Sequence, residues 1–155
     1  MKKRNLVITA VLLLLTALIA FFYLKDRSQP PRGNLIILDQ GREIPVDPFT
    51  LPLSEVKGTT VNGKGEEKEI SGKGVSVRDV LALAGIDDGN YTSIRVISSD
   101  EYAAGLQAEE IASGKTTFLI RDPAEDGTEK IRLIVFGDSG SKRQVKDVER
   151  IEVIK

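Results

Sequence analysis

Residues 74–85 carry the only clear helical period that follows the apolar N-terminal region. Their apolar side chains recur at intervals of three and four residues, which places them on one helix face: Val77, Val80, Leu81 and Ala84. Ser76 is a preferred N-cap residue, and Asp79 adds a negative charge to the first turn. Gly85 suits the left-handed position that ends many helices. The sequence therefore predicts one well-capped helix.

The segments around this helix alternate between apolar and polar residues over short runs, as strands do. Asn62-Gly63 is a strong hairpin signal, and the nearly all-charged arm after it is expected to be exposed. Strands are expected over residues 34–38, 42–46, 59–61, 66–70, 93–98, 102–106, 116–121, 130–136 and 148–154. Short helical segments are expected over residues 53–57 and 108–112, and a turn is expected over residues 123–127. The expected fold class is α+β, mostly β, with one main helix.

The N-terminal region predicts a membrane anchor. Residues 6–24 are 19 uncharged, mostly apolar residues, which as a helix span about 28 Å, close to the thickness of a hydrocarbon core. The basic residues at positions 2–4 favour a cytoplasmic N-terminus, with the soluble domain outside the cytoplasmic membrane. A cleaved signal peptide is the alternative. We expect the basic tip and anchor over 1–27, a linker over 28–33 and one soluble domain over 34–155.

Composition excludes several classes of function. The chain has no Cys, no His and no Trp, so disulfides, thiolate nucleophiles, the common zinc sites and Ser-His-Asp catalysis are excluded. From residue 33 onward there are 16 Lys and Arg against 22 Asp and Glu, a formal net charge of −6. Because nucleic-acid binding needs clustered basic residues, no nucleic-acid partner is expected.

Several segments together resemble the oxidoreductase molybdopterin-binding domain, the sulfite oxidase-like fold. Residues 74–86 are similar to its "G-V-x-L-R-D-L-L-x-x-A-G" helix, 98–102 to its "S-x-D-G-Y" turn, and 130–135 and 145–153 to two of its strands. The similar segments occur in the family's order between Phe49 and Ile154. The resemblance implies a mostly β domain that in the family's enzymes holds a pterin–metal cofactor.

This chain departs from the resembled enzymes at the positions that matter for chemistry. A cysteine thiolate ligates molybdenum in those enzymes, whereas this chain contains no cysteine. The family's His and Trp near the cofactor are also missing, and Glu101 replaces the glycine of the turn motif. No cofactor is therefore expected, and molybdopterin is suggested by the resemblance alone.

Two segments contain candidate ligand-binding residues. The Gly- and Ser-rich loop over 137–146 offers backbone amides and cations for an anion site: Ser139, Lys142, Arg143 and Lys146. The resemblance implies that this loop approaches a pterin phosphate; the alternative is a solvated hairpin loop between two antiparallel strands. Asp100 and Tyr102 form the second candidate, lining a pocket mouth beside Ser76.

The function expected from these observations is a non-catalytic ligand- or protein-binding module anchored in the membrane. Its expected partners are the membrane itself and either an envelope protein or a small anionic ligand. A molybdopterin-dependent oxidoreductase with non-cysteine ligation and a structural partner in an envelope complex remain as alternatives.

Overall fold

A computed structural model describes residues 15–16, 35–123 and 129–155. The chain divides near residue 31, and the unit Arg32–Lys155 contains nearly all of the described residues. The expected anchor over 6–24 lies outside the described residues, apart from Leu15 and Thr16. None of the helices that are described has the length and apolar character needed to cross a membrane.

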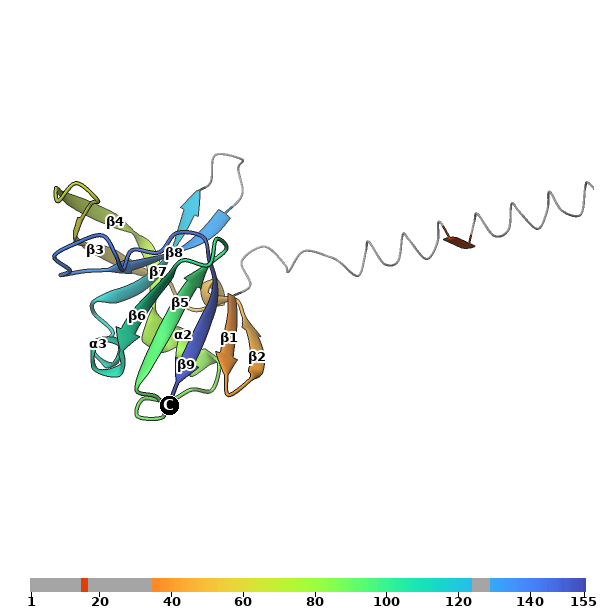
Figure 1. The fold of residues 1–155 in the computed structure, drawn as a ribbon. Helices are drawn as coiled ribbons and strands as arrows, with labels where there is room; N and C mark the ends of the chain where they lie inside the picture. Colours follow the sequence, from red (N-terminus) through yellow and green to blue (C-terminus); the bar gives the residue numbers. More distant parts are fainter. Residues whose placement is uncertain (1–14, 17–34, 124–128) are drawn as a thin grey trace, which may run out of the picture. The chain divides into compact units, whose positions relative to one another are not determined.

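The first sheet has five strands in the order β2-β1-β9-β5-β6 (Figure 1). Its strands are β1 (Leu35–Asp39), β2 (Arg42–Val46), β5 (Ser93–Ser98), β6 (Ala103–Gln107) and β9 (Val148–Ile154). β1 and β9 run parallel, and the other neighbours are antiparallel. Gln40 and Gly41 join β1 to β2 with φ angles of 51° and 80°. Positive φ at both central residues is typical of the tight turn that matches strand twist in a two-residue hairpin.

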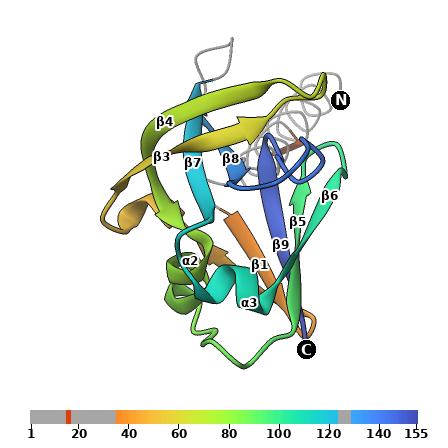
Figure 2. The ribbon, with the colours of Figure 1, turned by 90° about the vertical axis from the view of Figure 1, so that its left-hand side faces the viewer.

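The second sheet has four antiparallel strands in the order β3-β4-β7-β8. Its strands are β3 (Ser54–Val61), β4 (Glu67–Ser76), β7 (Thr117–Pro123) and β8 (Glu129–Val135). The β3–β4 hairpin pairs along its full length, but β4 pairs with β7 only over residues 74–76. The outer part of the hairpin therefore separates from β7; it lies at the upper left in Figure 1 and passes across the top of the domain in Figure 2.

Three short helical segments complete the domain: η1 (Pro48–Thr50), α2 (Val77–Leu83) and α3 (Ala108–Ala112). The Ser76 hydroxyl accepts a hydrogen bond from the Asp79 amide at 3.1 Å, and Gly85 has a φ of 78°. Both predicted ends of the main helix are thus confirmed. Figure 2 shows α2 and α3 side by side at one end of the sheets.

A cluster of buried apolar side chains holds the sheets together. The main core lies between the sheets and α2, and its fully buried members include Leu35, Leu81 and Leu133. Val56 on β3 and Ile134 on β8 are also buried, but they are not part of the main core. A β-carbon on Gly58 would lie 2.5 Å from the Phe136 ring, so a glycine is required for this approach.

The structure confirms the α+β, mostly β class. The predicted helical turn over 53–57 is wrong, because β3 occupies residues 54–61. Alternation of Val56, Gly58 and Thr60 toward one face, together with pairing to β4, outweighs any local helical preference. The hairpin at Asn62-Gly63 is confirmed, and so is the exposure of its charged second arm. The predicted turn over 123–127 lies almost wholly outside the described residues.

Thr117 gives a direct test of the main core. Its side chain is fully buried, and its hydroxyl has no hydrogen-bond partner among the described residues. Replacing Thr117 by the isosteric Val should raise the free energy of unfolding by about 1 kcal/mol, because a buried hydroxyl without a partner is costly. Urea unfolding measures the difference, with the exposed Thr59→Val as the control. A loss of stability in Thr117→Val would show that the hydroxyl is hydrogen-bonded.

Candidate functional site

The β8–β9 loop, residues 136–147, connects the two sheets. It leaves β8 at the edge of the four-stranded sheet and enters β9 in the middle of the five-stranded sheet. The two strands are not neighbours in either sheet, so the expectation of a hairpin loop between antiparallel strands is wrong. A chain segment of this length without regular structure needs other partners for its backbone groups.

Gln144 and Val145 attach the loop to the outer edge of β8. The Gln144 side-chain amide donates to the Val135 carbonyl at 2.6 Å and accepts from the Val135 amide at 3.2 Å. The Leu133 amide donates to the Val145 carbonyl at 2.8 Å, and the Val145 side chain is fully buried. One side chain and one loop residue therefore supply the bonds that a neighbouring strand would make.

Arg143 attaches the same loop to α3. Its guanidinium makes a two-pronged ion pair with Asp138 and a third bond to Glu110 Oε1 at 2.7 Å. The hydrogen bonds that Arg143 donates to Asp138 raise the pKa of Arg143 above its ordinary value despite partial burial. Burial favours a higher pKa for Glu110, but its bonds from the Gln107 amide and from Arg143 outweigh burial and lower it. Arg143 and Glu110 are therefore both charged at neutral pH, and the single guanidinium bridges two carboxylates.

Asp147 fixes the far end of the loop. Its carboxylate accepts from the Ser99 hydroxyl at 2.7 Å and from the Lys130 ammonium at 2.6 Å. Burial favours a higher pKa for Asp147, but the bonds from Lys130 and Ser99 prevail and lower it. Tyr102 supports the middle of the loop, because its hydroxyl donates to the Lys142 carbonyl.

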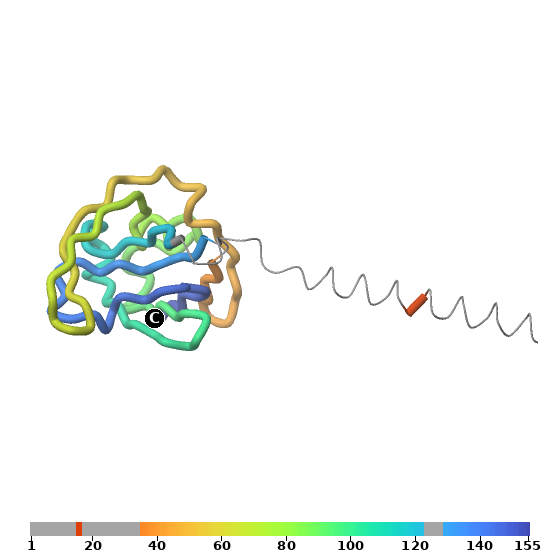
Figure 3. Tube along the Cα trace, turned by 90° about the horizontal axis from the view of Figure 1, so that it is seen from above, coloured from red at the N-terminus to blue at the C-terminus, as the bar shows by residue number. Residues whose placement is uncertain are grey.

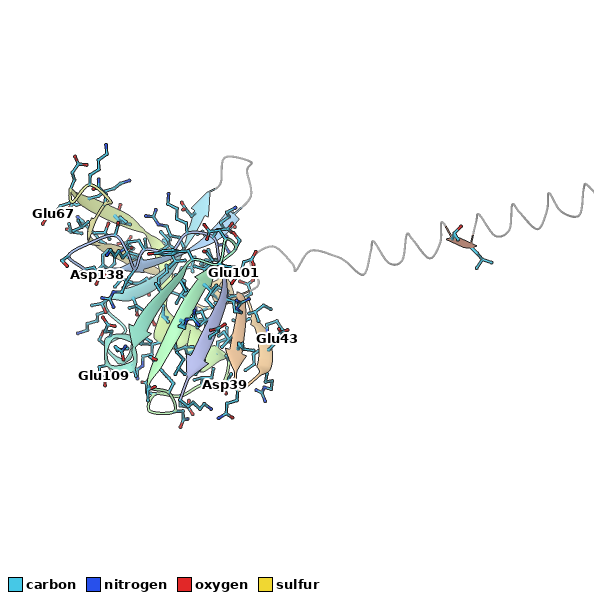
Figure 4. The ribbon with its side chains drawn as sticks, viewed as in Figure 1. Asp39, Glu43, Glu67, Glu101, Glu109 and Asp138 are labelled. Carbon is cyan, nitrogen blue, oxygen red and sulfur yellow. The ribbon has the colours of Figure 1, made fainter. Side chains whose placement is uncertain are left out.

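The β8–β9 loop and the tip of the β3–β4 hairpin lie side by side (Figures 1 and 3). A groove lies between them. We call it the loop–hairpin groove; it encloses about 600 Å³ and is open to solvent. Its lining residues are Val61, Asn62, Gly63, Gly65, Asp138, Ser139, Gly140, Ser141, Lys142 and Arg143. Figure 4 shows Asp138 on the loop and Glu67 on the neighbouring hairpin.

The polar groups of the groove divide into engaged and available ones. Asp138 and Arg143 bind each other, and the Asn62 side chain accepts from two amides of its own turn, at Lys64 and Glu66. The hydroxyls of Ser139 and Ser141 make no hydrogen bond to a described residue, and the Lys142 ammonium is exposed, with no ion pair in that part of the chain. Within the part of the chain that the structure describes, the groove thus presents two hydroxyls without partners and one exposed cation.

The structure brings some of the predicted site residues together and separates others. Ser139, Lys142 and Arg143 line the groove. Tyr102 does not line it, but its hydroxyl donates a hydrogen bond to the carbonyl of Lys142. Lys146 is exposed and does not line the groove.

The other two predicted site residues serve local structure. The Asp100 carboxylate accepts from the Ser98 hydroxyl and, at 3.2 Å, from the Tyr102 amide, and the Ser98 bond is the main cause of its lowered pKa. Ser76 is buried and caps α2. Asp100 lies in the turn at the start of β6, whereas α3 follows the end of β6. Ser76 begins α2, and α2 contacts α3, so Ser76 lies away from the turn at Asp100.

Sequence reasoning identified Arg143 and Tyr102 as candidate ligand-binding residues but did not identify the contacts that hold the loop in place. Glu110 is 33 positions from Arg143, and Gln144 recognises backbone rather than a side chain. Neither contact leaves a local pattern. The one available signal was Asp138 near Arg143 in a short loop, which indicates an ion pair as readily as an anion site.

The residues do not fit the pterin–metal group of the resembled enzymes. The chain has no cysteine to ligate the metal, and Arg143, the loop cation expected near a phosphate, already binds two carboxylates. Within residues 35–123 and 129–155, no three acidic side chains gather closely enough to hold a metal ion.

No protein-family model matches this chain, and no curated protein is significantly similar to it. The resemblance to the molybdopterin-binding domain therefore depends on the sequence motifs alone. What the structure establishes is a mostly β, α+β domain of two sheets, with a groove beside a loop that is bound at several points.

Arg143→Met should detach the loop from α3 and destabilise the domain by about 1–2 kcal/mol. The variant leaves two carboxylates facing each other without their cation, an effect reduced by partial exposure. Unfolding in urea measures the loss, and limited proteolysis should show faster cleavage within residues 136–147. The neighbouring Lys142→Met is the matched control, because it removes an exposed cation and should change neither quantity. Equal effects of the two variants would contradict this role of Arg143.

Proposed function

We propose that this domain is a non-catalytic binding module that holds an extended segment of another protein in the loop–hairpin groove. The observation that carries this proposal is the division of polar groups in the groove. Its acid and its arginine bind each other, whereas the hydroxyls of Ser139 and Ser141 and the single ammonium of Lys142 remain available. Such a surface suits a polar peptide better than a highly charged small anion.

The fixed loop supports the same proposal. Four sets of contacts hold the β8–β9 loop against β8, α3 and the β5–β6 turn. A wall that is ordered before binding reduces the entropy lost when a ligand is held. Catalysis by a desolvated acid or base has less support, because the carboxylates Asp138 and Glu110 already pair with Arg143.

The proposed location follows from the sequence alone. Residues 6–24 would anchor the protein in the cytoplasmic membrane and place the domain outside the cytoplasm. The partner would then be another protein of the cell envelope. This location and the resemblance to the molybdopterin-binding domain are both part of the proposal.

The groove can be blocked by one substitution. Gly63 lies at the hairpin tip with its φ outside the left-handed region, and an added β-carbon would meet only Ser141 Oγ, at 3.8 Å. Peptides selected from a random library against the full-length protein should bind Gly63→Trp at least about tenfold more weakly than the original chain. Gly105→Trp is the matched control, since Gly105 on β6 is exposed with open space around it.

Three results would contradict the proposal. They are equal binding of the peptides to both tryptophan variants, no enrichment of any peptide, and stoichiometric molybdenum or pterin in the purified full-length protein. The last result would favour the molybdopterin-dependent alternative.

A further inference from the structure

The four strands at the sheet edges differ in how far they are open to pairing. Pro45 lies inside β2 and lacks an amide hydrogen. β8 is covered by Gln144 and Val145. β6 has five residues, and its last amide, at Gln107, donates to Glu110 Oε2 at 2.9 Å. Only β3, among the edges described, is long, free of proline and uncovered.

The register of the hairpin shows which backbone groups of β3 point outward. The Asn62 amide donates to the Glu66 carbonyl at 2.9 Å, which fixes the phase of the β3–β4 ladder. Hydrogen-bonded and non-hydrogen-bonded pairs alternate along an antiparallel ladder. Even-numbered residues of β3 therefore bond to β4, and the amides and carbonyls that point away belong to Glu55, Lys57, Thr59 and Val61.

The side chains at these outward positions carry alternating charge. Glu55, Lys57 and Thr59 are all exposed on one face of β3. Charged residues on a sheet edge often prevent pairing with other chains. Glu55 and Lys57 need not prevent pairing, because they have opposite charges and lie two residues apart. When two copies of the strand run antiparallel, the acid of each copy can lie opposite the lysine of the other.

We propose that a second copy of this chain pairs with β3, edge to edge and antiparallel, with Glu55 opposite Lys57 of the second copy. The two-fold symmetry of the pair produces this contact twice. It centres the pairing on Val56 and joins the two four-stranded sheets into one continuous sheet. Since the overlap ends near Thr59, the loop–hairpin groove beyond Val61 remains open in both copies.

The neighbouring registers are less favourable. The backbone amides and carbonyls that point away from β4 belong to odd-numbered residues, and they must face the same groups of the second copy. The register can therefore shift only in steps that keep odd-numbered residues opposite each other. One such step in either direction places Glu55 opposite Glu55 or Lys57 opposite Lys57, and like charges directly opposite are destabilising. A further step in the direction that first places Lys57 opposite Lys57 would put Glu55 opposite Val61 of the second copy. The second copy would then cover the groove, because Val61 lines it.

Engineered cysteines test this geometry cleanly, because the chain has none of its own. In the proposed register Leu53, which is 40% exposed, lies opposite Thr59 of the second copy. The full-length Leu53→Cys/Thr59→Cys variant should form a disulfide-linked dimer on mild oxidation, since Cα atoms of such pairs lie about 5.5 Å apart. Each single variant should form no disulfide-linked dimer, because identical positions are then about 20 Å apart.

Charge exchange is the second arm and leaves the backbone intact. Glu55→Lys or Lys57→Glu should raise the dimer dissociation constant of the full-length chain roughly tenfold in sedimentation experiments. The double exchange Glu55→Lys/Lys57→Glu should restore it. The control is Glu109→Lys, an exposed change on α3.

The proposal is overturned by any of four results. These are no disulfide-linked dimer in the double-cysteine variant, linkage in the single variants, a dissociation constant indifferent to the charge at positions 55 and 57, and linkage of the thiol introduced at position 59 to a different protein. Failure of this proposal leaves peptide binding at the groove untouched, since Gly63→Trp acts outside the paired segment.

Discussion

The site depends on a side chain acting in place of a strand. The amide of Gln144 makes both hydrogen bonds of the Val135 backbone, and the Val145 carbonyl accepts from Leu133. Without these bonds β8 would expose an unpaired edge, and the β8–β9 loop would lose its attachment to β8. The same contacts thus close the edge of one sheet and hold the segment that leads into the other.

The groove forms because the second sheet is curled. One wall is the tip of the β3–β4 hairpin at one edge of that sheet, and the other is the loop that follows β8 at the opposite edge. The β3–β4 hairpin curls over Phe136, which its glycine at position 58 permits, and brings the tip at Gly63 beside the loop. Arg143 then joins the loop to α3 and binds the two acids nearest to it. The result is a polar, ordered surface without a free acid–base pair among the described residues, which is the physical basis for proposing binding rather than catalysis.

Features with local causes could be predicted from the sequence. The cap at Ser76, the left-handed end at Gly85 and the terminal strand over 148–154 each depend on residues close together in the chain. The strand was predicted over 59–61, but its first part, from Ser54, was missed because pairing with β4 along the whole hairpin outweighs the local preference of residues 53–57.

The candidate site was predictable only in part. Ser139, Lys142 and Arg143 were identified as polar groups of one loop, and all three line the groove. The role of Arg143 was not predictable, since its partner Glu110 lies on another element. Ser76 and Asp100 were expected beside one pocket mouth, whereas the fold separates them. Ser76 ends β4 of the second sheet and caps α2, and Asp100 lies in the turn after β5 of the first sheet.

The central claim is that the β8–β9 loop is a fixed part of the fold and that the groove is formed before any ligand arrives. Amide hydrogen exchange of the full-length protein tests it most directly. The Leu133 and Val135 amides, which face the outer edge of β8, should exchange as slowly as the Ile151 amide in the middle of the first sheet. Exchange of these two amides at rates close to those of the unfolded chain would contradict the claim.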